Sequence, residues 1–126
     1  MPLPLEPHAT APDGSDVRVL LRQAGGSMAH FSLPPGKTSI AVTHRTVEEI
    51  WYVLDGTGEM WRKQDDRQEV VELREGVCLT IPLGTHFQFR ATGDAPLNIL
   101  GVTMPPWPDT DDEAVPVDGR WEPTAS

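Results

Sequence analysis

Two side chains five positions apart, His44 and Glu49, have the types and spacing that could do chemistry in this chain. An imidazole and a carboxylate that meet in a folded protein can share a metal ion or pass a proton. His86 is a third candidate, because two histidines and one carboxylate form a facial set of ligands that suits non-heme Fe(II). These residues therefore predict either a metal centre or an acid–base pair with Glu49 as the base.

The segment that follows His44 has the pattern of a strand that must position this carboxylate. Between residues 48 and 54 alternate side chains fall on opposite faces, so one face carries Glu49, Trp51 and Val53, and the other carries Ile50, Tyr52 and Leu54. Both faces are apolar enough to be buried, and we expect a barrel wall that is packed inside and covered outside. Glu49 is the polar member of its set, so it needs a cation, a hydrogen-bond donor or a proton.

The rest of the chain repeats short β-rich runs separated by Gly, Pro or Asp turns, without a helical period. Many short strands at such spacing predict an all-β sandwich or barrel. The predicted strands are Val17–Gln23, Met28–Leu33, Thr38–His44, Glu48–Leu54, Gly58–Lys63, Glu69–Leu73, Val77–Ile81, Thr85–Ala91 and Leu97–Met104.

Three regions are expected along the chain. Residues 1–16 form an extended amino-terminal arm, residues 17–104 the barrel and residues 105–126 a Pro-rich tail. The tail carries Trp107 and Trp121, and large aromatic side chains in a polar segment indicate that it packs on the barrel or on a partner subunit.

Composition excludes several classes of partner. The chain has 126 residues, which suits one domain, and a formal net charge of −9 from 19 acidic and 10 basic side chains. Such a surface repels nucleic acid and anionic membranes. We find no apolar run of about 20 residues that would span a bilayer and no signal-peptide pattern at the amino terminus. A cytoplasmic location is the expectation.

Two glycine and proline frames in this chain resemble the motifs of the cupin superfamily. The first cupin motif is G-x5-H-x-H-x(3,4)-E-x6-G, and Gly36, Glu49 and Gly56 match its glycine and glutamate positions. The second is G-x5-P-x-G-x2-H-x3-N, and its first three positions match Gly76, Pro82 and Gly84. The resemblance covers about Gly36 to Met104. Within it, the segment EEIWYVLDGTGEM and the later segment TIPLGT are similar to sequences of small single-domain cupins.

The resemblance implies a double-stranded β-helix, or jelly-roll, barrel, often a homodimer, with an interior pocket for a small molecule. In metal-binding cupins three histidines and the glutamate hold Fe, Mn, Ni, Zn or a similar divalent ion. His44 falls on the second histidine position of the first motif, where the first becomes Val42, and Phe87 stands at the histidine position of the second motif. His86 is one residue early, so it reaches the pocket only if a bulge after Gly84 turns it inward.

Three functions stay open from the sequence, and they leave open whether the protein is an enzyme. The first is a small-molecule-binding cupin without metal, with a polar corner at His44 and Glu49. The second is a metal-dependent dioxygenase or isomerase that uses His44, Glu49 and His86 on a small organic substrate. The third is a metal-free lyase or isomerase with Glu49 as base. The predicted pocket side chains are Val42, Trp51, Phe87 and Phe89.

Overall fold

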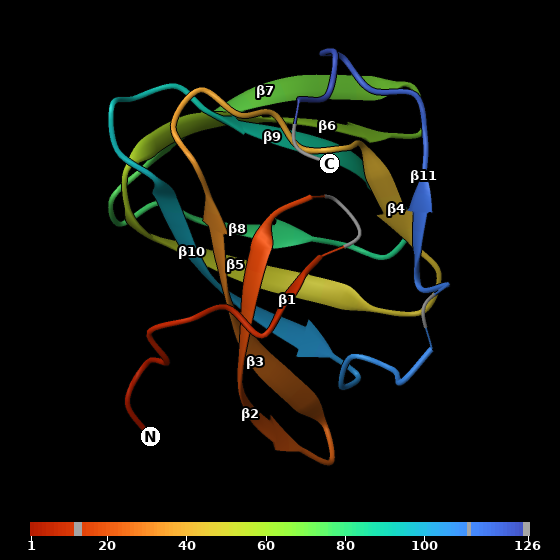
Figure 1. The fold of residues 1–126 in the computed structure, drawn as a ribbon. Helices are drawn as coiled ribbons and strands as arrows, with labels where there is room; N and C mark the ends of the chain where they lie inside the picture. Colours follow the sequence, from red (N-terminus) through yellow and green to blue (C-terminus); the bar gives the residue numbers. More distant parts are fainter. Residues whose placement is uncertain (12–13, 111, 125–126) are drawn as a thin grey trace.

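The fold consists of two antiparallel sheets that face each other and enclose the core (Figure 1). The structure is a computed structural model that describes residues 1–11, 14–110 and 112–124. These residues form strands, turns and loops without a helix, which confirms the predicted all-β class. Accordingly, the described residues contain no helix of the length and apolarity that crossing a membrane requires.

One sheet has six strands and carries Glu49. In spatial order they are β1 (Ala9–Thr10), β2 (Asp16–Gln23), β3 (Gly26–Leu33), β10 (Leu97–Met104), β5 (Glu48–Asp55) and β8 (Cys78–Ile81). The central strand β10 joins segments far apart in the sequence, because it pairs with β3 on one side and with β5 on the other. Thr103 of β10 is thereby paired with both Glu49 and Ser27.

The second sheet has five strands and carries His44. In spatial order they are β11 (Ala114–Pro116), β4 (Val42–His44), β9 (His86–Ala91), β6 (Thr57–Gln64) and β7 (Arg67–Arg74). The predicted strand at 38–44 is shorter than expected, since only its last three residues are a named strand and Thr38 makes an isolated bridge to Arg90.

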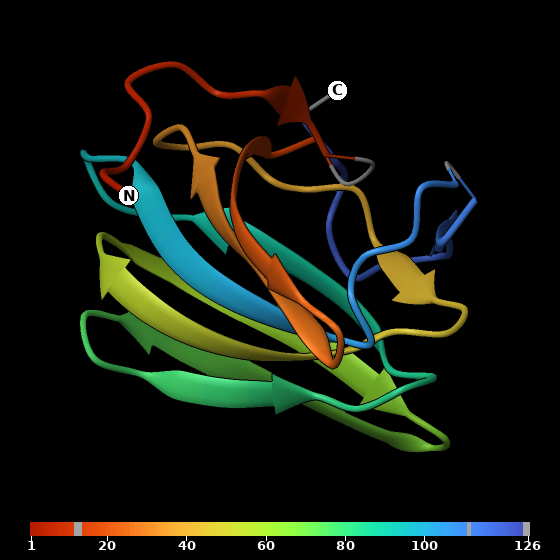
Figure 2. The same ribbon diagram turned by 90° about the horizontal axis from the view of Figure 1, so that it is seen from below.

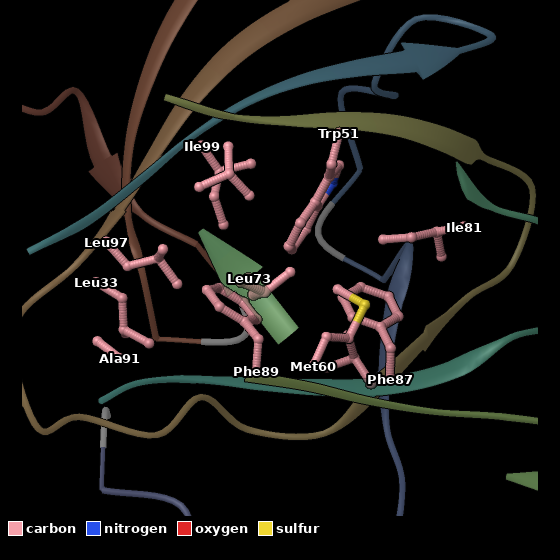
Figure 3. Close-up of a cluster of buried hydrophobic side chains, with 12 residues drawn as sticks. Leu33, Trp51, Met60, Leu73, Ile81, Phe87, Phe89, Ala91, Leu97 and Ile99 are labelled. Carbon is pink, nitrogen blue, oxygen red and sulfur yellow. The ribbon is translucent and has the colours of Figure 1, made fainter. Parts of the chain in front are cut away.

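The core lies between the sheets and is apolar throughout (Figure 3). Trp51 and Ile99 project from the six-stranded sheet toward Phe87 and Phe89 of the five-stranded sheet. The indole of Trp51 meets the Phe89 ring edge-on at 5.1 Å between centroids, a favourable geometry for aromatic pairs. This core holds β5 and β9 in place, and these strands carry the residues that define the site.

Strand β5 alternates as predicted, but the prediction that its outer face is covered is wrong. Glu49, Trp51 and Val53 point inward and are at most 3% exposed. The outward set is open to solvent, with exposures of 46% for Ile50, 44% for Tyr52 and 37% for Leu54. Large apolar side chains tolerate this partial exposure, because much of the surface of a folded protein is apolar.

The carboxyl-terminal tail runs along the five-stranded sheet, as the blue segment beside β4 in Figures 1 and 2 shows. Strand β11 pairs with β4, so that Ala114 lies opposite His44. Further along, the N–H of Thr124 donates to the carbonyl of Thr38. The guanidinium of Arg90 stacks 4.1 Å from the ring centroid of Trp121, an arrangement of the cation–π type.

The turn between β5 and β6 requires glycine at position 56, and we expect Gly56→Ala to be markedly destabilising. Gly56 has φ +86°, and a Cβ there would lie 2.5 Å from the carbonyl oxygen of Pro96. Gly76 has a similar φ of +88° but open space around it. In urea titrations the free energy of unfolding of Gly76→Ala should fall by about 1–2 kcal/mol, because alanine disfavours the left-handed backbone. Gly56→Ala should lose this amount and more, because the backbone must also move away from Pro96. Equal losses would contradict the close contact with Pro96.

Candidate functional site

A cavity of about 360 Å³ opens between the sheets, at the end where β4, β5 and the start of the tail meet. Its polar corner consists of His44 and Glu49. Most of the other described lining side chains are apolar: Val17, Val19, Met28, Ala29, Phe31, Val42, Trp51, Phe87, Trp107 and Ala114. A concave, mostly apolar space with a few converging polar groups is the usual form of a small-molecule site.

The two sheets bring His44 and Glu49 together across the cavity. Nδ1 of His44 lies 3.3 Å from Oε2 of Glu49, and both side chains are almost fully buried. The Trp51 indole N–H donates to Oε1 of Glu49 at 3.3 Å. Nδ1 of His44 makes no hydrogen bond among the described residues despite its short distance to the carboxylate. The corner thus combines a carboxylate that accepts from Trp51 with an imidazole nitrogen that has hydrogen-bonding capacity left.

Burial keeps the His44 imidazole uncharged near neutral pH. Desolvation lowers the pKa of His44 to about 4, although the negative charge of Glu113 acts in the opposite direction. The close contact with Glu49 is therefore one between a neutral ring and a carboxyl group at pH 7. A neutral imidazole can donate or accept a hydrogen bond, but it contributes no positive charge to the cavity.

Glu113 supports the loop that carries His44 into place. Its carboxylate accepts hydrogen bonds from the N–H groups of Thr46 and Val47 and from the Thr46 hydroxyl. Burial opposes ionisation of Glu113, but these hydrogen bonds outweigh it and hold the pKa below its usual value. Glu113 therefore acts as an ionised anchor between the tail and the residues that link His44 to Glu49.

Trp107 closes one side of the cavity and was not among the predicted pocket residues. Its ring meets the His44 ring edge-on at 5.2 Å between centroids. Its backbone N–H donates to the hydroxyl of Ser27 at 3.0 Å, and the Ser27 hydroxyl is also hydrogen-bonded to Thr103. The signal for Trp107 was a large aromatic residue in a polar tail, which predicted packing but not its position beside His44.

His86 does not reach this corner. It begins β9, which pairs with β6 in unbroken register from His86 to Ala91. Phe87 points into the cavity, so its neighbour is directed to the other side of the strand, and His86 is absent from the described lining. The bulge that would turn His86 inward is not present in this pairing.

Of the four predicted pocket residues, three line the cavity and one does not. Val42, Trp51 and Phe87 are lining residues, and Val42 lies directly opposite Phe87 in the pairing of β4 with β9. Phe89 instead lies in the hydrophobic core behind Trp51, with Leu33 and Leu97 nearby (Figure 3). The structure thus places Phe89 one layer deeper than the cavity.

Comparison with known proteins decides the family. The model of the family described as "Cupin domain" matches residues 29–103, which is more than half of the chain. The chain is a cupin. An uncharacterized protein of Methanocaldococcus jannaschii is 32% identical to this cupin over 114 residues, which cover 86% of this chain and 87% of that protein.

Solved structures agree with the cupin fold. KdgF from Halomonas sp. superposes with a TM-score of 0.68 at 16% identity, covering 79% of this cupin and 87% of that chain. The oxalate decarboxylase of Bacillus subtilis, described with Mn(II) centres, superposes with a TM-score of 0.66 at 19% identity. The match covers 77% of this cupin but 27% of that enzyme. At these identities the similarity establishes the double-stranded β-helix fold.

The donor atoms in this cupin do not fit the three-histidine, one-glutamate metal site. Val42 and Phe87 stand at two of the histidine positions and line the cavity with hydrocarbon. Within residues 1–11, 14–110 and 112–124, no group of three or more His, Cys, Asp or Glu side chains is arranged to hold a metal ion. Two protein donors, His44 and Glu49, fall short of the three that catalytic metal sites normally supply.

Proposed function

We propose that this cupin binds a small organic molecule in the cavity, with His44 and Glu49 as the polar corner that orients it and without a metal ion between them. The observation that carries the proposal is the cavity itself, whose volume of about 360 Å³ lies in the range typical of ligand sites, about 300–1,000 Å³. Its mostly apolar walls favour a compact hydrophobic body, and the polar corner at His44 and Glu49 favours one defined orientation.

The hydrogen-bonding state of His44 supports a ligand group at this corner. Nδ1 of His44 is buried without a hydrogen bond among the described residues. A buried polar nitrogen in that state costs free energy, which a hydrogen bond to a ligand would recover. A polar group of the ligand that reaches His44 and Glu49 together would make this hydrogen bond and so favour binding.

Metal-dependent chemistry of the kind named for the oxalate decarboxylase receives less support. It would require His86 to join His44 and Glu49, and in the structure Phe87 occupies the side of β9 that faces the cavity. We therefore derive no reaction step through a metal ion.

Metal-free acid–base chemistry is the second candidate. The observation that favours it is the placement of the Glu49 carboxyl in a mostly apolar cavity, 3.3 Å from a neutral imidazole. In that role Glu49 would take a proton from the bound molecule and His44 would orient the reacting group. The chemistry would use the binding site proposed above, so binding is the property to test first.

Filling the cavity should abolish binding. Ala29 lines the cavity, and Ala29→Leu adds hydrocarbon where the ligand would lie. In isothermal titration calorimetry with benzyl alcohol, a neutral probe, we expect the wild-type protein to bind and Ala29→Leu to lose about tenfold or more in affinity.

Ala24→Leu is the matched control, because Ala24 is exposed in the turn between β2 and β3. It should leave the affinity for benzyl alcohol unchanged. Equal affinities for wild type and Ala29→Leu, or failure of the wild type to bind either benzyl alcohol or its amine analogue benzylamine, would overturn the proposed function.

A further inference from the structure

The described lining of the cavity contains one acidic side chain. Glu49 is the acidic residue among the described lining side chains, and neither Lys nor Arg occurs among them. The whole chain carries a net charge of −9, which favours a cation over an anion as its ligand. A negative cleft with walls of low dielectric constant concentrates cations and repels anions.

Four aromatic side chains line the same cavity as this carboxyl group. The indole of Trp51 stacks on Phe31 at 5.9 Å between centroids and meets Phe87 edge-on at 5.8 Å. Trp107 lies beside the His44 ring on the tail side of the cavity. The faces of such rings are negative, and Trp attracts a cation most strongly. Phe31, Trp51, Phe87 and Trp107 therefore make the lining of this cavity largely aromatic, and the Trp107 ring is available to a cation because the Trp51 indole presents its N–H edge to Glu49.

We propose that the ligand is a small organic cation, a protonated or quaternary amine on an apolar body, held with its ammonium group near Glu49 and beside the ring of Trp107. This inference rests on the proposed function and narrows it to one class of ligand. A nearby ammonium group favours the ionised form of Glu49, which then provides the counter-charge. The Trp107 ring provides cation–π attraction, and the apolar walls accept the rest of the molecule.

The same contacts disfavour two other classes. A carboxylate or phosphate ligand would meet Glu49 without a Lys or Arg among the described lining residues. A polyol would need a hydrogen-bonding partner for each of several hydroxyl groups, whereas most of the described lining side chains are apolar. Polar groups that lose water without gaining a partner cost binding free energy.

Three probes of nearly equal shape test the inference by calorimetry at one pH near 7 and one salt concentration. They are benzylamine, which is a cation there, benzyl alcohol, which is neutral, and benzoate, which is an anion. We expect benzylamine to bind about tenfold or more tightly than benzyl alcohol and benzoate to show no binding. Equal or tighter binding of benzyl alcohol would overturn the inference while leaving the proposed function standing. Failure of benzyl alcohol and benzylamine alike would overturn both.

Two variants test which side chains cause the preference for benzylamine over benzyl alcohol. Glu49→Gln keeps the shape of the side chain and removes its charge, so the ratio of benzylamine to benzyl alcohol affinity should fall about tenfold. Glu72→Gln is the matched control, because the Glu72 side chain is 76% exposed on β7, outside the described lining. This control should retain the wild-type ratio.

Trp107→Leu provides a second test that does not alter the buried carboxyl group. Trp107 lies in the tail and its side chain is only partly buried, so folding should tolerate the change. Loss of the indole should weaken benzylamine binding about fivefold more than benzyl alcohol binding. Circular dichroism melting confirms that each variant is folded. A wild-type ratio in both Glu49→Gln and Trp107→Leu would overturn the inference.

Discussion

Replacing Trp51 with alanine is expected to lower the free energy of unfolding by about 3–5 kcal/mol. The indole is 2% exposed and fills the space between the sheets, where it contacts the rings of Phe31, Phe87 and Phe89. Its removal leaves a void that the two sheets cannot close, and it removes the N–H that donates to Glu49. Urea unfolding followed by circular dichroism measures the loss.

Trp51→Phe separates the contribution of ring packing from that of the indole N–H. It keeps an aromatic ring at the centre of the core but lacks the N–H that contacts Glu49, and we expect a smaller loss of about 1–2 kcal/mol. A loss below about 1 kcal/mol for Trp51→Ala, which surface positions typically show, would contradict the central packing role of this residue.

Gln88→Glu is expected to lower the free energy of unfolding by about 3 kcal/mol or more, although the two side chains have nearly the same shape. Gln88 is 1% exposed, and its Nε2 donates to the carbonyls of Ser39 and Trp121. Its Oε1 accepts from the N–H groups of Arg120 and Trp121. A glutamate has no N–H for the two carbonyls, so a buried charge would face their oxygens and the tail would separate from the sheet.

Gln68→Glu is the matched control for this change. Gln68 is exposed on β7, and its Oε1 accepts from the indole N–H of Trp61 at 3.1 Å. A carboxylate can accept that hydrogen bond equally well, so the loss should stay within about 0.5 kcal/mol. Urea titrations of both variants provide the comparison, and similar losses would mean that the hydrogen bonds of Gln88 do not hold the tail.

Local sequence patterns predicted much of the barrel. The alternation from Glu49 to Leu54 predicted that Glu49, Trp51 and Val53 share one face, because side chains of a strand alternate regardless of their neighbours. The structure shows that this face is the buried one. Gly56 also followed from the sequence as the last glycine of the first motif, and its left-handed backbone favours glycine. These features depend on residues adjacent in the chain, and single-sequence reasoning handles such features well.

The features that the sequence did not reveal depend on long-range contacts. The short strand β11 exists because the tail pairs with β4, and Trp107 reaches the cavity because Ser27, 80 positions earlier, accepts its N–H. The outer face of β5 has the same apolar pattern as a buried face, so its exposure depends on which segments cover the sheet. In the candidate site, the meeting of His44 and Glu49 followed from the motif, whereas the direction of His86 required the register of β9.

The most direct test is a crystal structure of the protein soaked with benzylamine. We expect density for the ring inside the cavity, beside Trp107, with the nitrogen within hydrogen-bonding distance of Glu49. Density for the probe on the outer surface alone, or a metal ion coordinated by His44 and Glu49 in its place, would contradict this expectation.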